Sequence, residues 1–442
     1  MLTAFVRAFQ TPDLRKKMLI TLGLIALFRF GASLPTPGVN VHNVTVCSNL
    51  ATSAGSATAG VLAIVNLLSG QALLRLSVFA LGIMPYITAS IILQLLTVVI
   101  PRLETLKQEG QAGQAKITQY TRYLTVGLAV LQSTGYVELA RSGTLFNGCG
   151  NAGNNPIIPN DSVFTIATMV ICMVAGTTVI MWMGELITDR GVGNGMSVLI
   201  FTTVISVIPG EILAIYRSKS PFYAAVAILV VIAIVAFIVF MEQAQRRIPV
   251  QYAKRMVGRR MYGGTSTYIP MKVNQAGVIP VIFASSLLYI PTLAAQLFGN
   301  QSHPQGWVGW ISRYVEQSNS PIYMLSFFVL IVGFTYFYVS ITFNPTEVAD
   351  NMKKYGGFIP GIRPGRPTAE YLQYVLSRLT APGSVYLGII ALFPLVALSA
   401  AGVANQFPFS GVSLLIMVGV GLDTVKQIES QLQQRNYEGF LR

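Results

Sequence analysis

The sequence predicts an all-α polytopic membrane protein with ten transmembrane helices, and three observations support this class. Hydrophobic residues make up 53% of the 442 positions and charged residues only 10%, whereas soluble domains carry about 25% charged residues. The mean hydropathy is +0.59. Apolar runs of about 20 residues, the length that crosses a bilayer as a helix, recur along the chain.

Ten such runs follow one another without an inserted soluble domain, and the longest interruptions are 243–274 and 343–381. The predicted spans are residues 18–37, 77–99, 118–138, 163–184, 195–212, 222–242, 275–296, 322–342, 383–403 and 408–425. Ten spans divide into five plus five. An odd number of spans in each half turns the second half upside down, which is the inverted-repeat plan of many transport proteins.

The positions of the basic residues predict the topology, because cytoplasmic loops are enriched in Lys and Arg. The net charge is +14. If the N-terminus is cytoplasmic, most Lys and Arg residues fall in cytoplasmic segments, including both long interruptions. The opposite segments hold only Arg141, Arg217, Lys219 and Arg313, and two further arginines, Arg29 and Arg75, lie at membrane depth. Both termini are therefore expected in the cytoplasm.

The cysteines and histidines do not predict a metal site. Cys47, Cys149 and Cys172 lack metal-ligand spacing, and the two histidines lie far apart in loops. No cofactor is expected either. Cys47 and Cys149 both fall in segments predicted to be external, so a disulfide is compatible with the topology. Two unrelated thiols are nevertheless the expectation.

Catalytic and ion-coupling motifs are not found in the sequence. There is no HExxH, GxSxG or P-loop pattern, which makes an intramembrane enzyme a remote alternative. Ion-coupled transporters usually carry an ionisable group at the bilayer midplane, but Glu185, Asp189 and Asp423 lie near span ends. An ion-coupled small-solute transporter is therefore the disfavoured alternative to a passive channel.

Two spans contain helix-breaking residues at their beginning. Gly82 and Pro85 lie in the first turns of the second span, and Gly277 and Pro280 lie in the first turns of the seventh. Gly and Pro are common in membrane helices. However, these two spans are counterparts in the two halves, and paired interrupted spans indicate a central site.

The two long interruptions have a composition that suits docking of a large partner. The first, 243–274, interleaves aromatic, Thr and Ser residues with basic ones, and the second, 343–381, contains the turn-rich segment GFIPGIRPG. Such basic clusters are usually only topology signals. These are longer than topology requires, and their turns and positive charge favour contact with a large partner, for which an RNA backbone is one candidate.

Taken together, seven segments closely resemble the SecY family, the large subunit of the bacterial protein-conducting channel. The segments occur in the order and at the spacing of the family, from about Asp13 to the C-terminus. Only external loops such as 139–162 do not resemble the family. The segments are GIMPYITASIILQLL, KQEGQAGQAKITQYTRY, DRGVGNGMS, RRIPVQYAKR, KVNQAGVIPVIFASS, NPTEVADNMKKYGGFIPGIRPG and VSLLIMVGVGLDTV.

The resemblance implies two five-helix halves around an hourglass pore: an N-terminal half, 1–212, and a C-terminal half, 213–442. It implies that the short piece at about 61–74 is a plug, a half-helix that includes Asn66, Leu67, Leu68, Ser69, Gly70 and Gln71. It further implies an apolar constriction, called here the pore ring, of Ile83, Ile87, Met196, Ile200, Ile282 and Ile416. Position 196 is commonly isoleucine in the family.

The pore ring is physically reasonable for a channel that passes many sequences. Ile83 and Ile87 are four residues apart, as are Met196 and Ile200, so each pair shares a helix face. A narrow apolar neck excludes water and ions and offers no hydrogen bonds to a passing chain. Isoleucine in a membrane bundle is usually ordinary packing, so without the resemblance the ring would not be predicted.

The resemblance also implies a lateral gate at the seam between the second and seventh spans. Its candidate polar latches are Thr88, Gln94, Gln132 and Asn274, since interhelical amide bonds of about 1 kcal/mol are weak enough to open. Pairing of these residues within the bundle is the alternative. The loop-tip Arg363 and the pair Arg259 and Arg260 are implied to dock the SecA motor and the ribosome.

The implied setting is the bacterial plasma (inner) membrane, which the chain crosses many times. The implied partners are the SecE and SecG subunits, the SecA ATPase, the ribosome, nascent or secretory polypeptides and the lipid bilayer. A second SecY copy is a further candidate partner. The implied function is passive, gated passage of unfolded polypeptides across the membrane and of membrane segments sideways into it.

Overall fold

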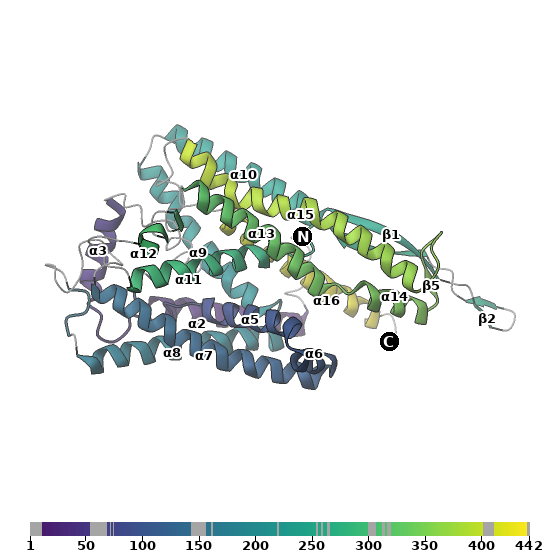
Figure 1. The fold of residues 1–442 in the computed structure, drawn as a ribbon, viewed down its shortest axis with the longest axis horizontal. Coiled ribbons are helices and arrows are strands. Elements are labelled where there is room, and N and C mark those ends of the chain that lie inside the picture. The colour runs from purple at the N-terminus through teal and green to yellow at the C-terminus, as the bar shows by residue number, and fades with distance from the viewer. Residues whose placement is uncertain are drawn as a thin grey trace.

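The computed structural model describes most of the chain: residues 11–53, 69–142, 156–218, 221–298, 306–311, 314–315, 320–400 and 411–439, with short gaps at 71, 74, 161, 253–254, 258–259 and 263–265. Ten helices coincide with the ten predicted spans (Figure 1). They are α2 (Pro12–Ser33), α5 (Met84–Val99), α7 (Gln111–Ser142), α8 (Val163–Arg190), α9 (Gly195–Ser218), α10 (Pro221–Gln243), α11 (Ile279–Phe298), α13 (Pro321–Thr342), α15 (Arg366–Ala400) and α16 (Gly411–Gly439).

Within the described residues, four helical segments are long and apolar enough to cross a membrane by themselves. They are Val163–Arg190, Pro321–Lys354, Arg366–Pro394 and Gly411–Gln433. A fifth candidate is the pair formed by α5 and α6 (Pro101–Gln108), which is bent by 100°. Pro101 is the first residue of α6, and a proline there cannot continue the preceding helix. The membrane-helix class is thus confirmed, while the count of ten spans stays a prediction.

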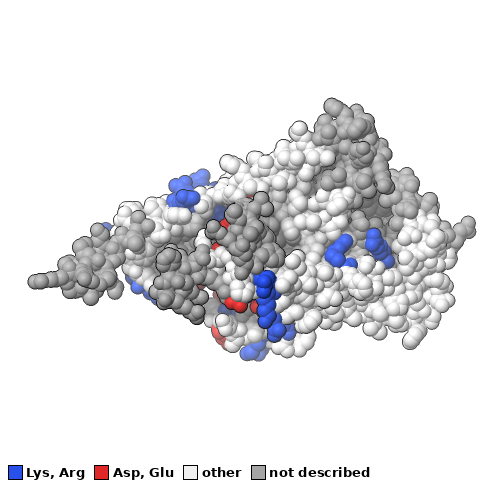
Figure 2. Space-filling view, turned by 180° about the vertical axis from the view of Figure 1, so that it is seen from behind, with Lys and Arg blue, Asp and Glu red and all other residues white. Residues whose placement is uncertain are grey.

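Large apolar side chains face outward on several helices, as they do where a protein contacts lipid rather than water. Examples are Phe30 of α2, Leu229 and Phe240 of α10 and Leu325 of α13, each more than 60% exposed. On the face seen in Figure 2 the uncharged surface dominates the right-hand half. Two basic patches lie in that half, and the other charged groups of this face lie in the middle of the view and to its left.

The helices lie in two groups with three helices between them (Figure 1). Helices α2, α5, α7 and α8 form the lower group, α10, α13 and α15 the upper one, and α9, α11 and α16 lie between. Helix α11 contacts α5 and α7 as well as α13, and α9 contacts α16 and α8. The largest apolar cluster of the molecule extends through both groups.

The predicted helix breaks are present in both counterpart segments. Gly82 (φ +55°) and Gly277 (φ +63°) adopt left-handed backbone conformations that favour glycine. Helices α5 and α11 then begin two residues later, with Pro85 and Pro280 in their first turns, where proline is tolerated. The segments GIMPYITAS and GVIPVIFAS share five residues at matching positions, which agrees with an internal repeat.

The two interruptions predicted as loops contain strands that join in one sheet. Strands β1 (Gln245–Tyr252), β4 (Ser266–Lys272) and β5 (Gly357–Phe358) pair antiparallel in the order β4-β1-β5. On β1, Ile248 and Val250 are both buried and lie two residues apart, as expected for a strand with one covered face. A separate hairpin is formed by β2 (Arg255–Val257) and β3 (Arg260–Tyr262).

Three local predictions differ from the structure. Helix α15 begins at Arg366, so residues 366–381, predicted as loop, are helical, because the helix continues beyond its apolar part. A short helix, α3 (Val41–Ser53), occupies a segment predicted as external loop. The expectation of two unrelated thiols was wrong, since Cys47 is disulfide-bonded while Cys172 is free. The other cysteine, Cys149, lies outside the described residues.

Candidate functional site

The six predicted pore-ring residues all belong to the largest apolar cluster. Ile83, Ile200, Ile282 and Ile416 are buried, with exposed fractions of 2%, 5%, 7% and 0%, and Ile87 and Met196 are partly buried against them. They come from α9, α11, α16 and the beginning of α5, where Ile83 caps the helix. The structure therefore brings four separate elements to one apolar region.

Met196 is also engaged in helix packing. A Cβ atom at Gly184 of α8 would lie 2.5 Å from the Met196 sulfur, so the thioether packs against the bare backbone of that glycine. The flexible side chain of methionine suits such an irregular contact. At this position the ring residue thus contacts a neighbouring helix as well as the apolar cluster.

The predicted plug lies mostly outside the described residues, which include Ser69 and Gly70 but not Asn66, Leu67, Leu68 or Gln71. Ser69 is buried, and its hydroxyl accepts a hydrogen bond from the Leu73 amide at 3.3 Å. Gly70 has a φ of +67°, and a Cβ atom there would lie 3.0 Å from Nη1 of Arg29. Arg29, one of the two arginines that the sequence places at membrane depth, thus lies against this segment.

Residues 69–83, called here the entry segment, lead from Gly70 to α5. Most of its described residues are buried, whereas Arg75 is exposed. The Leu76 carbonyl accepts hydrogen bonds from the amide and the hydroxyl of Thr36 at 3.0 and 2.7 Å. Phe79 stacks on Phe28 of α2, with ring centroids 6.0 Å apart. The entry segment is therefore packed into the helix bundle directly before Ile83.

The four predicted gate residues occupy different surroundings. Thr88 is buried and donates its hydroxyl to the Met84 carbonyl at 3.0 Å within α5. Gln132 is buried on α7, whereas Gln94 is exposed. Asn274 is 3% exposed, and its side-chain amide donates to a carboxyl oxygen of Glu242 at 2.5 Å. In this structure Asn274 pairs within the bundle, which is the alternative that the sequence left open.

A cavity of about 330 Å³ borders α5, the helix that carries Thr88 and Gln94. It is formed between α5, α6 and α7 on one side and α13 on the other. Polar side chains dominate its lining, among them Gln94, Gln114, Thr118 and Tyr338. One face of α5 therefore borders a polar recess.

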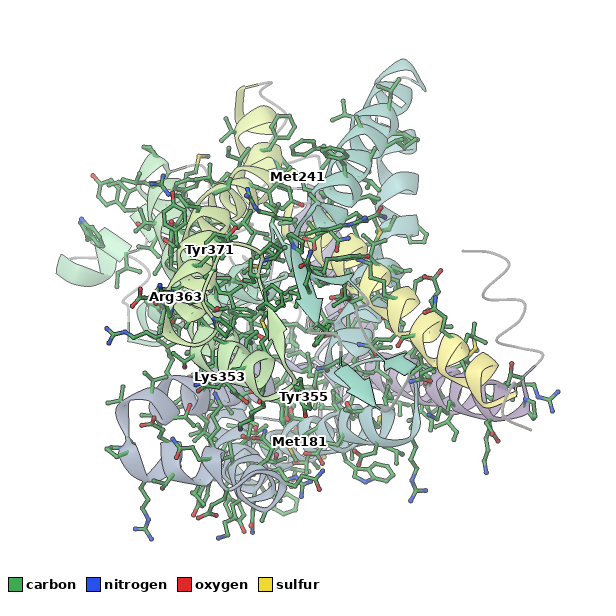
Figure 3. The ribbon with its side chains drawn as sticks, turned by 90° about the vertical axis from the view of Figure 1, so that its right-hand side faces the viewer. Met181, Met241, Lys353, Tyr355, Arg363 and Tyr371 are labelled. Carbon is green, nitrogen blue, oxygen red and sulfur yellow. The ribbon has the colours of Figure 1, made fainter. Side chains whose placement is uncertain are left out.

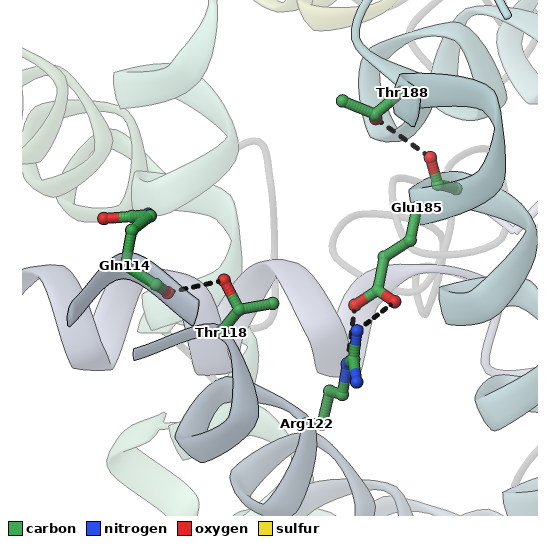
Figure 4. A network of polar contacts seen from close by, with 6 residues as sticks. Gln114, Thr118, Arg122, Glu185 and Thr188 are labelled. Atoms are coloured by element: carbon green, nitrogen blue, oxygen red, sulfur yellow. Dashed lines mark hydrogen bonds and ion pairs between the residues drawn. The ribbon is translucent and has the colours of Figure 1, made fainter. Parts of the chain in front are cut away.

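An ion pair fixes α7 to α8 near this recess (Figure 4). The Arg122 guanidinium donates to both carboxyl oxygens of Glu185, at 2.9 and 2.7 Å. The carboxylate is only 19% exposed, whereas the arginine is 49% exposed. Two parallel hydrogen bonds give the pair a fixed geometry. The ion pair therefore ties α8 to α7, one of the helices that line the recess.

The two long interruptions form one body, called here the loop platform, from the sheet β4-β1-β5 and α14 (Pro345–Lys354) with the first turns of α15. A separate apolar cluster that includes Ile248, Met352 and Leu372 holds it together. Asn344 caps α14 by accepting from the amides of Thr346 and Glu347. The platform is therefore a folded unit and not a pair of independent loops.

Arg363 lies on the surface of this platform, between two glycines in left-handed conformations, Gly361 and Gly365. Figure 3, which views the end of the molecule that carries the platform, shows Arg363 together with Lys353 and Tyr355. The Arg363 carbonyl accepts from the Thr368 hydroxyl at 2.9 Å, which ties the tip to α15. Of the other two docking residues, Arg260 lies in β3 and Arg259 lies outside the described residues.

The buried carboxyl group of Glu242 was not predicted from the sequence. It lies at the end of α10 and is 8% exposed, beside Asn274. A glutamate at the end of a predicted span looks solvent-exposed in sequence, so no local signal distinguishes it. Among the described residues, no group of three His, Cys, Asp or Glu side chains could hold a metal ion.

This fold is that of protein-conducting channels. A solved structure described as a protein-conducting channel superposes with a TM-score of 0.63 at 16% identity, covering 94% of this chain and 92% of that one. The Sec61 channel of a canine ribosome-channel complex from the endoplasmic reticulum gives a TM-score of 0.59 at 15% identity, with the same coverage.

The sequence comparisons then identify the family. The SecY family model matches residues 77–425. The protein translocase subunit SecY of Streptomyces galbus is 64% identical over 446 residues, and that of Mycobacterium bovis is 58% identical over 447 residues. Both alignments cover the whole of both chains. The chain belongs to the SecY family.

Proposed function

We propose that this chain is the pore-forming subunit of a protein translocase. It acts as a passive, gated channel that moves unfolded polypeptides across the plasma membrane and membrane segments sideways into it. The observation that carries this proposal is the end-to-end identity of 64% with a protein translocase subunit. The ion-coupled transporter alternative has no support from the family, and the channel is a transport subunit rather than an enzyme.

The pore ring supplies the seal in this proposal. Its six members belong to one apolar cluster and come from elements that are far apart in sequence, which supports a shared constriction. An apolar neck lowers the local density of water and so resists ion flow. Because it offers no hydrogen-bond partners, it does not favour one polypeptide sequence over another.

The plug and the gate complete the resting channel. The buried entry segment, anchored through Thr36 and Phe28, supports a resting position for the plug that precedes it. The contact between α5 and α11 supports a lateral gate at that seam, with Thr88, Gln94, Gln132 and Asn274 nearby. A sufficiently apolar segment leaves through the gate because it partitions into lipid.

The loop platform provides the docking surface for an energy source, either the SecA motor or the ribosome. Arg363 is exposed at its tip, where a guanidinium is able to bind a phosphate or carboxylate through two hydrogen bonds. Arg259 and Arg260 are further proposed docking residues. The SecE and SecG subunits, secretory polypeptides, lipid and a second copy of the chain are the remaining proposed partners.

The proposed topology has both termini and the loop platform in the cytoplasm. The excess of basic residues in these segments supports it. The proposed halves, 1–212 and 213–442, each contribute one interrupted helix, α5 or α11. The matching GIMPYITAS and GVIPVIFAS segments support this division.

The proposal is tested by reconstitution of the purified channel complex in vesicles. With the SecA motor and ATP, a secretory precursor is expected to become protected from added protease. Radiolabelled small solutes are expected not to accumulate under an imposed proton or sodium gradient. Solute accumulation without precursor protection would favour the transporter alternative and refute the proposal.

A further inference from the structure

The buried pair of Glu242 and Asn274 occupies the junction between α10 and α11. Glu242 is the last residue but one of α10. Its carboxyl oxygen accepts from Nδ2 of Asn274 at 2.5 Å, and both side chains are almost fully buried. A buried polar group that loses its hydrogen bond destabilises the structure, so neither partner is readily replaced.

The same amide group holds the turn that begins α11. Nδ2 of Asn274 also donates to the Gly277 carbonyl at 3.2 Å. Gly277 is the left-handed residue of this turn, and α11 starts two residues later. The Glu242 carboxyl thus orients the side chain that fixes the first turn of α11.

The loop platform also begins at this junction. The Val273 amide donates to the Ala244 carbonyl at 3.0 Å, and Gln245 and Lys272 form the first pair of the β1–β4 ladder. The Lys272 ammonium lies 3.3 Å from the Asp423 carboxylate of α16. A displacement of the hairpin therefore reaches the residues that flank Glu242 and Asn274.

Helix α15 limits the directions in which this junction is able to move. A Cβ atom at Gly383 would lie 2.4 Å from the Val273 carbonyl oxygen, so α15 is in direct contact with the backbone of the junction. Oδ1 of Asn274 is buried without a hydrogen-bond partner among the described residues. The contact with α15 therefore restricts movement of the junction toward that helix.

We propose that Glu242 is a positioning residue that couples the loop platform to the gate helix α11 through Asn274. In the resting channel the Glu242–Asn274 hydrogen bond holds the first turn of α11 closed. A partner that displaces the hairpin moves Ala244 and Val273, separates Asn274 from Glu242 and releases α11. This inference rests on the proposed lateral gate between α5 and α11.

The experiment measures the distance across the gate with a pair of nitroxide labels. Val98→Cys on α5 and Leu287→Cys on α11 are suitable, since both positions are exposed (54% and 44%). Cys172→Ser removes the free thiol, and Cys47 is disulfide-bonded and does not react. The channel complex is placed in lipid nanodiscs, and label distances are recorded with and without a ribosome that carries an arrested secretory chain.

Four changes separate positioning from simple packing. Glu242→Leu removes the group that accepts the hydrogen bond from Asn274, and Asn274→Asp places a second carboxyl group opposite that of Glu242. Glu242→Gln keeps an acceptor oxygen for Asn274, and the double change Glu242→Gln with Asn274→Asp restores a donor and acceptor pair with reversed polarity. Glu138→Leu is the matched control, because Glu138 is 53% exposed on α7, outside the loop platform, and its partner Arg141 lies on the same helix.

In the resting channel, Glu242→Leu and Asn274→Asp are expected to increase the population of the longer distance on the order of tenfold. Glu242→Gln and Glu138→Leu are expected to retain the distribution of the parent. The double change is expected to lower the population of the longer distance relative to Asn274→Asp alone, without returning it to that of the parent, because an aspartate at 274 no longer donates to the Gly277 carbonyl. Suppose that the ribosome lengthens the label distance in the channel without changes at 242 and 274, while all variants show that channel's resting distances. The role of Glu242 is then wrong, whereas the proposed gate remains supported. A lower Tm with unchanged distances in Glu242→Leu would likewise show a purely structural role.

If the engaged ribosome leaves the distance between positions 98 and 287 unchanged in the parent, the proposed gate itself is wrong. The proposed role of Glu242 is then wrong as well. Failure of Glu242→Leu to fold does not remove the test, because Asn274→Asp and its rescue by Glu242→Gln report on the same hydrogen bond. Absence of that rescue overturns the coupling.

Discussion

Gly176 of α8 offers a direct test of how the entry segment is seated in the resting channel. A Cβ atom at this position would lie 2.1 Å from the Val78 carbonyl oxygen and 3.0 Å from the Val78 side chain. The Val78 peptide has little freedom to retreat, because its amide donates to the Leu34 carbonyl at 2.9 Å. Gly176→Ala therefore forces the entry segment away from α8.

The magnitude follows from the cost of overpacking, which is about 1–3 kcal/mol for added methyl groups in a well-packed region. At about 1.4 kcal/mol for each factor of ten, the equilibrium between the seated and displaced segment shifts by about 5-fold to about 150-fold. Ile83 of the pore ring lies five residues beyond Val78. Displacement of Val78 is therefore expected to disturb the seal as well.

The assay is the open probability of the resting channel in a planar bilayer, recorded without motor or ribosome. Gly127→Ala on α7 is the matched control, because a Cβ atom at Gly127 has no other atom within 4 Å. Gly176→Ala is expected to raise the open probability several-fold over this control. Equal open probabilities for the two variants would refute the seating of the entry segment against α8.

Three further predictions concern the ring, the platform and the topology. Replacing Ile87 and Ile200 together with serine should raise the resting ion conductance, because hydroxyl groups keep water in the neck; unchanged conductance would refute the ring. Arg363→Glu should abolish export by the channel with its motor without loss of assembly. Arg366→Glu is the control and should retain export, because Arg366 is 90% exposed and pairs with Glu370. Equal export by both variants would contradict the docking role. A phosphatase fused near Asn154 should be active outside the cytoplasm, and an inactive fusion would reverse the topology.

Local chemistry explains why some features were predictable from the sequence. Gly82 and Pro85 act on the backbone of their own residues, so the break before α5 could be read directly, as could the matching break at Gly277 and Pro280. Helices of about 20 apolar residues were equally evident from hydropathy. The ends of these helices were less evident from hydropathy. Helix α15 begins as early as Arg366, because a helix is able to extend beyond its apolar stretch.

Features that depend on pairing between distant segments could not be predicted. Strand β5 pairs with β1 across more than 100 residues, and its two residues carry no strand signal. Glu242 resembles a solvated glutamate at a span end until Asn274 is placed beside it. The bonded state of Cys47 likewise required the fold. The positions of the pore ring came from the family resemblance, because isoleucine is common in every membrane helix.

The central claim is that a translocating polypeptide passes through the pore ring, and site-specific crosslinking to an arrested chain tests it most directly. A photo-reactive residue is placed at Ile83 or Ile282, with Leu325 of α13, which is 66% exposed, as the control position. Passage through the ring predicts crosslinks from both ring positions that depend on the arrested chain, and few from position 325. Crosslinks of equal yield at all three positions, or only at position 325, would contradict passage through the ring.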